Sequence, residues 1–271
     1  MTLTPSGTAS LTPDRVRDVA DAGARRLALS VDGGSRAAHD EFRGEPGSFE
    51  STMQAAAAAH DAGLPLQINT TVCAETVSQL PAIRNLVADL GAVLWSGFFL
   101  VPVGRGAVLD AIGPERAEDV MAWLAEVEAE EEYGSKTTEA PHYRRVALQR
   151  EHESGAGVAA DAIGRRTGIT AGDGFAFVSH VGDVFPLGLL PKSAGNVRER
   201  GLVDIYRDAD LFTDLRDPDA LRGKCGACEY RGVCGGSRSR AYATTGDPLC
   251  AYVPEGYGGP FPSDRPAATG D

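Results

Sequence analysis

The sequence lacks the features of a membrane protein, a secreted protein or a nucleic-acid-binding protein. Its 271 residues contain no run of about 18 apolar residues, so no membrane-spanning helix is expected. The first eight residues, MTLTPSGT, have neither the basic start nor the apolar stretch of a signal peptide, which favours the cytoplasm. Only 26 Lys and Arg oppose 38 Asp and Glu, and no basic block occurs, so a nucleic-acid partner is not expected.

Cysteine is also scarce, and its distribution is uneven. Four of the five cysteines have the spacing C-x2-C-x5-C-x15-C, at Cys225, Cys228, Cys234 and Cys250. In a reducing compartment such crowding indicates metal ligation rather than disulfides. Four thiolates suit either a [4Fe–4S] cluster or a tetrahedral zinc ion, and one C-x2-C pair plus two single cysteines favours the cluster. Cys73 has no Cys or His at ligand spacing and is interpreted as a structural thiol.

The first half of the sequence alternates predicted helices and strands. Apolar runs predict strands, and N-cap residues or prolines followed by apolar stripes predict helices between them. This alternation predicts an α/β fold with a parallel sheet and right-handed crossovers. The expected strands are 27–31, 64–72 and 92–101, and the expected helices begin at Thr12-Pro13, at a Ser48 cap, at a Thr76 cap and at Pro114.

The second half has a different character. Residues 135–142 are polar and predict a loop, which leads into a helix over 143–152 and a Gly- and Ala-rich connection over 153–173. Two short apolar runs around Val181-Gly182 predict a β-hairpin. Gly195-Asn196 predicts a turn, residues 203–206 predict a short helix, and the tail from Pro254 is predicted to be disordered.

Several of these segments resemble radical S-adenosylmethionine (SAM) proteins. GFAFVSHVGDVFP at 174–186, AGNVR at 194–198 and the cysteine spacing resemble their twitch or SPASM auxiliary-cluster domain. LSVDG at 29–33 with HDEFRG at 39–44 resembles the fourth strand and following loop of their partial (β/α) barrel. Residues 68–72 resemble the fifth strand, and residues 95–102 resemble the sixth. The resemblance implies a partial barrel (1–133, strands 3 to 6), a linker with a helix (134–173), a small α+β auxiliary-cluster domain (174–254) and a tail (255–271).

The resemblance also implies cofactors and site residues. Cys225, Cys228, Cys234 and Cys250 would hold one auxiliary [4Fe–4S] cluster, since Pro186 is followed by Leu187 and not by a further cysteine. Ser30 and Arg43 match positions that contact the SAM carboxylate; the alternatives are a strand end for Ser30 and an ordinary surface ion pair for Arg43. Glu139 or His142 could touch substrate, or simply belong to a capped helix start.

One departure from the family limits the expected activity. The C-x3-C-x2-C loop that binds the SAM-cleaving cluster is absent, as is the Gly-Gly-Glu motif, and the sequence begins near the third strand. These residues alone are therefore not expected to cleave SAM. A misassigned start, a split gene whose partner chain supplies the missing strands, and a degenerate relative that only binds all remain open. The substrate would be a peptide or a tetrapyrrole-like molecule, and the alternative function is a non-enzymatic adaptor stapled by zinc or iron–sulfur.

Overall fold

The chain forms two compact units in a computed structural model that describes residues 1–154, 170–242 and 246–259. The first unit comprises Met1–Ile112 and Trp123–Thr138, and the second comprises Gly113–Ala122 and Glu139–Asp271. The greater part of the expected connection over 153–173, and the end of the expected tail, lie outside the described residues. Among the described helices, none has the length and apolar character needed to span a membrane.

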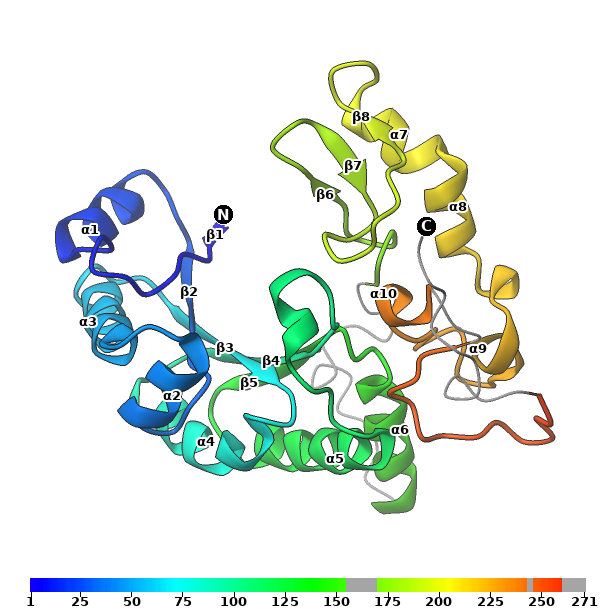
Figure 1. Cartoon of the computed structure of the whole chain (residues 1–271), viewed down its shortest axis with the longest axis horizontal. Helices are drawn as coiled ribbons and strands as arrows, with labels where there is room; N and C mark the ends of the chain where they lie inside the picture. Colours follow the sequence, from blue (N-terminus) through cyan, green and yellow to red (C-terminus); the bar gives the residue numbers. More distant parts are fainter. Residues whose placement is uncertain (155–169, 243–245, 260–271) are drawn as a thin grey trace. The chain divides into compact units, whose positions relative to one another are not determined.

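The first unit is built on a parallel sheet, which confirms the predicted α/β class. Its five strands are hydrogen-bonded in chain order, β1-β2-β3-β4-β5, and every neighbouring pair is parallel (Figure 1). The strands are β1 (Thr2–Leu3), β2 (Arg26–Ser30), β3 (Leu66–Val72), β4 (Leu94–Phe99) and β5 (Gly134–Thr138).

Strand β5 corrects the prediction of a polar loop over 135–142. Its residues pair with β4 from Gly134 opposite Leu94 to Thr138 opposite Phe98. Strands pair through backbone hydrogen bonds, which do not depend on the side chains. Because β5 pairs with only one described strand, its side chains need not be apolar on both faces of the sheet. The polar sequence GSKTT therefore did not predict a strand, although pairing with β4 stabilises one there.

The helices of the first unit cross between these strands. They are α1 (Pro13–Asp21), α2 (Arg36–Arg43), α3 (Ser48–Asp61), α4 (Leu80–Asp89) and α5 (Pro114–Glu130), whose second half belongs to this unit. As predicted, Thr12 caps α1 by accepting a hydrogen bond from the Arg15 N–H. Helix α2 was not foreseen within the segment interpreted as a loop; Ser35 caps it, and Gly44 ends it in a left-handed conformation.

Two predicted caps are wrong. Ser48 is the first residue of α3, and Asp40 accepts the N–H groups of Gly47 and Phe49 at 2.8 and 2.7 Å in the role expected of Ser48. Thr76 precedes a 3₁₀ turn (Val77–Gln79) and instead donates its hydroxyl to the carbonyl of Thr71. In both places the side chain predicted to cap the helix hydrogen-bonds a preceding residue instead, Ser48 to Asp40 and Thr76 to Thr71.

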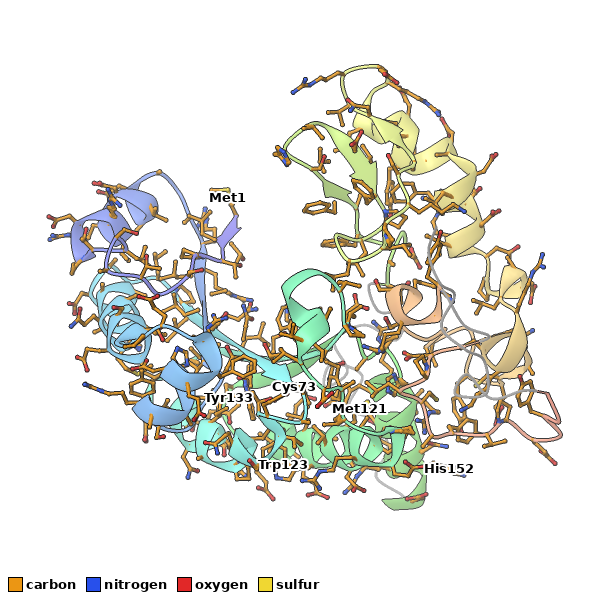
Figure 2. The ribbon with its side chains drawn as sticks, in the orientation of Figure 1. Met1, Cys73, Met121, Trp123, Tyr133 and His152 are labelled. Carbon is orange, nitrogen blue, oxygen red and sulfur yellow. The ribbon has the colours of Figure 1, made fainter. Side chains whose placement is uncertain are left out.

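The core of the first unit includes an aromatic cluster on the helix-covered side of β4. Trp95 packs edge-on against Trp123 and Tyr133, both labelled in Figure 2, and its indole N–H donates to the Thr70 hydroxyl at 2.9 Å. Cys73, directly after β3, is fully buried in the same unit, with its Sγ 3.4 Å from the Thr76 hydroxyl. Burial raises the pKa of Cys73, as expected for a structural thiol.

The second unit combines short helices with a small antiparallel sheet. Its helices are α6 (Tyr143–Ser154), α7 (Leu202–Asp208), α8 (Asp210–Arg216), α9 (Gly223–Ala227) and α10 (Arg238–Ala241). The predicted hairpin is present as β6 (Phe177–Val178) and β7 (Asp183–Phe185). Gly195-Asn196, predicted as a turn, is a third strand, β8, paired with β7 (Figure 1). Val184, Ile205 and Phe212 form the core beneath this sheet.

Candidate metal centre

The four closely spaced cysteines line one pocket of the second unit. Cys225, Cys228, Cys234 and Cys250 line this pocket together with Arg145, Lys224, Arg231, Asp247 and Tyr252. The buried Cys73 belongs to the other unit. The structure thus brings together the four cysteines selected by spacing and separates the one that was set aside.

Helix α9 positions the first two cysteines. Cys225 lies within this short helix, and Cys228 follows it in an extended conformation, so the chain turns between the two thiols. Gly226 stands where a Cβ would come within 2.3 Å of the Leu221 carbonyl oxygen. Only glycine fits this C-x2-C turn without displacing the backbone before it.

Tight turns position the other two cysteines. The N–H of Cys234 donates to the Tyr230 carbonyl at 3.0 Å, and the N–H of Cys250 donates to the Asp247 carbonyl at 3.2 Å. After Cys234, Gly235 and Gly236 both have positive φ, and the Gly236 N–H donates to the Cys234 Sγ at 3.4 Å. Such N–H groups aimed at sulfur stabilise a thiolate or a cluster sulfur.

The thiols are protonated in the absence of a metal. Burial raises the pKa of all four, and that of Cys234 reaches about 12. A neighbouring cysteine raises the pKa of Cys225, Cys228 and Cys234 further, because nearby thiolates would repel. Metal binding at this pocket must therefore release protons, and the metal's positive charge provides the compensation.

The spacing of the donor side chains bears on which metal the pocket could hold. Within residues 1–154, 170–242 and 246–259, no three His, Cys, Asp or Glu side chains form a group that could hold one metal ion. Four separate thiolates around a space are the donor set of a [4Fe–4S] cluster.

A buried polar network adjoins the pocket, and sequence reasoning identified only two of its members. Glu139 accepts a short hydrogen bond from the Ser237 hydroxyl, and its carbonyl accepts one from Arg240. His142 is fully buried, with Nδ1 3.9 Å from an Asp247 oxygen. Burial raises the pKa of Glu139 and lowers that of His142 to about 4. Of these two residues, His142 thus lies in the interior of this unit and Glu139 is half-buried, and contact of either with substrate stays a prediction.

The proposed SAM-contact residues lie in the first unit. Ser30 ends β2 opposite Asn69 of β3, and Arg43 lies in the last turn of α2. The Arg43 Nε lies 3.3 Å from an oxygen of Asp32, which is buried and also accepts the Thr71 N–H at 2.6 Å. Arg43 thus forms an ion pair, but with a buried partner and not at the surface as the alternative supposed, and contact of Ser30 or Arg43 with SAM stays a prediction.

Comparison with known proteins identifies the family. No protein-family model matches the chain. It is 43% identical over 252 residues to the AdoMet-dependent heme synthase of Methanosarcina barkeri, covering 90% of this chain and 72% of that protein. The chain belongs to the radical SAM family. The AdoMet-dependent heme synthase of Nitratidesulfovibrio vulgaris is 40% identical to this radical SAM protein over 262 residues, covering 93% of this chain and 71% of that protein.

Solved structures show the same fold at low sequence identity. Streptococcus suis SuiB matches with a TM-score of 0.66 at 15% identity, covering 93% of this chain and 60% of SuiB. anSMEcpe with bound AdoMet matches with a TM-score of 0.59 at 13% identity, covering 88% of this chain and 65% of anSMEcpe. This radical SAM protein therefore spans less than two thirds of the length of either solved chain, and at these identities the likeness concerns the fold alone.

Proposed function

We propose that the second unit is an auxiliary-cluster domain of the twitch type, whose four cysteines hold a [4Fe–4S] cluster in a radical SAM reaction on a tetrapyrrole. The observation that carries this proposal is the single pocket shared by four thiols from three separate turns. When bound, such a cluster supplies one-electron transfer at low potential. The pocket residues hold it, shield it from water and compensate its charge.

The chemistry of the pocket supports a cluster over zinc. In a [4Fe–4S] cluster each iron takes one cysteine thiolate, so the four sulfurs need not converge on one point. A structural zinc ion would need all four within one tetrahedral shell. Arg145, Lys224 and Arg231 line the pocket and offset the negative charge of the four thiolates.

The relatives support a tetrapyrrole substrate. Besides the heme synthases, the chain is 28% identical to a pre-heme d1 synthase of Dinoroseobacter shibae and 25% identical to an Fe-coproporphyrin III synthase of Methanosarcina barkeri. A PqqA peptide cyclase of Methylocella silvestris is 27% identical. Because the heme synthases, at 40% and more, are clearly nearer than the peptide cyclase, a tetrapyrrole is the preferred substrate class.

SAM binding is proposed for the first unit. Ser30 would donate its hydroxyl to the SAM carboxylate, and Arg43 would share its guanidinium between Asp32 and that carboxylate. The 271 residues contain no C-x3-C-x2-C motif, so the thiolates of a SAM-cleaving cluster would come from further residues of a longer polypeptide or from a partner chain. A reducing compartment such as the cytoplasm fits the closely spaced thiols.

Metal analysis tests the cluster. The protein is purified anaerobically and reconstituted with iron and sulfide, and we expect about four irons and four sulfides per chain. Cys234→Ser should lose most of this iron, whereas Cys73→Ser, the control in the other unit, should retain it. A wild-type chain that takes up zinc without sulfide would overturn the proposal and leave the zinc-stapled adaptor.

Ligand binding tests the substrate class separately. The reconstituted protein is titrated with iron-coproporphyrin III and, in parallel, with a PqqA peptide. Saturable binding of the tetrapyrrole, seen as a shift of its absorption band, is expected without peptide binding. Peptide binding alone would contradict the tetrapyrrole assignment while leaving the cluster intact.

A further inference from the structure

Two oppositely charged side chains are buried in the wall of the four-cysteine pocket. Asp247 is 0% exposed and Lys224 is 5% exposed, and both line the same pocket as the four thiols. Burying a charge costs several kcal/mol unless it is paired and hydrogen-bonded. Neither residue belongs to the cysteine spacing, so their burial here needs a separate explanation.

Asp247 joins the segment after Cys234 to the turn before Cys250. Its Oδ2 accepts the Ser237 N–H at 2.7 Å and an Arg240 Nη at 3.1 Å. Its Oδ1 accepts the Arg240 Nε at 2.9 Å and the Leu249 N–H at 3.1 Å. Both oxygens are thus occupied by donors, which makes the carboxylate a brace between two turns and leaves it poorly suited to ligate iron.

Asp247 also reaches the first cysteine. Its backbone hydrogen-bonds Cys225 and thereby lowers the thiol's pKa against the larger, opposite effect of burial. Because both of its side-chain oxygens accept hydrogen bonds and Arg240 pairs with it, Asp247 is a carboxylate, a fixed negative charge beside the pocket.

Lys224 makes the complementary connection. It precedes Cys225 in α9, and its Nζ donates to the carbonyl of Cys250 at 2.6 Å. It therefore ties the C-x2-C helix to the turn that carries the last cysteine. Together Lys224 and Asp247 connect all three segments that supply the four thiols.

We propose that Asp247 and Lys224 are positioning residues that assemble the four-cysteine pocket and set the reduction potential of its cluster in opposite directions. This inference rests on the proposed iron–sulfur function. Reduction adds one electron to the cluster and changes no bond of the protein. A nearby cation stabilises the added negative charge and a nearby anion opposes it, and both effects are strong where water is excluded.

A redox titration of charge variants tests this inference. The full chain is reconstituted with iron and sulfide, and its cluster is reduced with dithionite, which donates the electron and is oxidised to sulfite. The midpoint potential is followed by EPR and absorption. Asp247→Asn should raise the potential, Lys224→Met should lower it, and Lys224→Arg, which keeps the charge, should leave it near that of the wild type.

The matched control is Asp208→Asn. Asp208 pairs with Arg200 at 2.9 Å in the same unit, but both side chains are largely exposed, so solvent screens the same chemical change. Its potential should equal that of the wild type. A purely structural role of the buried residues would change cluster content without shifting the potential in opposite directions.

The outcomes separate this inference from the proposed function. If both variants retain the cluster and their midpoint potentials shift in opposite directions, the inference is supported. If both retain the cluster and their potentials stay unchanged or shift in the same direction, the inference is overturned. If Asp247→Asn fails to load, the contrast between Lys224→Met and Lys224→Arg decides in the same way. A wild-type chain that binds no iron and sulfide contradicts the cluster itself and is recognised before any variant is compared.

Discussion

Gly236 lies against Cys225 so closely that a Cβ at position 236 would stand 3.0 Å from the Cys225 Sγ. The same glycine has a φ of +73°, and its N–H donates to the Cys234 Sγ at 3.4 Å. It therefore contacts two candidate ligands from two different turns. Glycine is required here both by the space beside the sulfur and by the left-handed backbone.

Gly236→Ala should weaken cluster binding. An alanine costs about 1–2 kcal/mol in the left-handed region, and its methyl group would push against the Cys225 sulfur. Iron and sulfide per chain after reconstitution measure the effect. Gly232→Ala is the control, because a Cβ there meets nothing within 4 Å. Equal iron content in the two variants would contradict the role of Gly236.

Trp95→Ala should destabilise the first unit. The side chain is fully buried, contacts Trp123 and donates to Thr70, so its removal should cost about 3–5 kcal/mol of unfolding free energy. Denaturant unfolding followed by circular dichroism measures it. Phe98→Ala, on the same strand but 36% exposed, should cost clearly less; a similar loss would place the core elsewhere.

Arg145→Met should destabilise the second unit. Arg145 is buried, pairs with Glu118 and lies with its guanidinium carbon 4.9 Å from the Tyr252 ring centre. Losing one partner of a largely buried ion pair costs about 3 kcal/mol, seen as a lower unfolding free energy. Arg200→Met, which breaks the exposed pair with Asp208, should cost at most about 1 kcal/mol. An equally small loss for Arg145 would refute its structural role.

His39 should make the stability of the first unit depend on pH. Burial lowers its pKa below 6.5, and its Nδ1 accepts the Asp32 N–H at 3.2 Å, which requires the neutral ring. Below pH 6.5 the unfolded chain binds more protons at this residue, so the stability it contributes is present above pH 6.5 and lost as the pH falls.

The comparison of His39→Gln with wild type measures this dependence. The unfolding free energies of wild type and variant, measured between pH 5 and pH 8, should approach each other as the pH falls. The wild type then loses the stability that neutral His39 contributes, and the variant lacks that contribution at every pH. His180→Gln, in the exposed turn after β6 of the other unit, is the control for replacing a histidine by glutamine outside the first unit. A course for His39→Gln parallel to that of the wild type would show that His39 titrates alike in both states.

Spacing alone predicted which four cysteines share one pocket. Cys225 and Cys228 lie in one turn because only two residues separate them in the chain. Gly226 allows that turn to pack against the Leu221 carbonyl. Continuous apolar runs, separated by predicted helices, likewise predicted three of the five parallel strands closely. These features are local, because a turn or an apolar run carries its own physical signal.

Elements without a local signal could not be predicted in this way. Strand β5 is polar, and β8 is the dipeptide Gly195-Asn196, a typical turn sequence. Both are strands because a neighbour offers unpaired backbone groups at the right register. Helix α2 was missed for a related reason, since its cap, Ser35, lies in a segment whose apolar face is small.

By itself the sequence determined the α/β class, the donor set of four thiols and the separation of Cys73 from them. The tertiary structure decided which charges surround those thiols. Lys224 reaches the carbonyl of Cys250, and Asp247 reaches Ser237 and Arg240, only after the chain has folded back on itself. Cysteine spacing decides which sulfur atoms could bind a metal. The electrostatic field at such a site depends on charged residues that folding brings close, in places from which water is excluded and where their charges are therefore weakly screened.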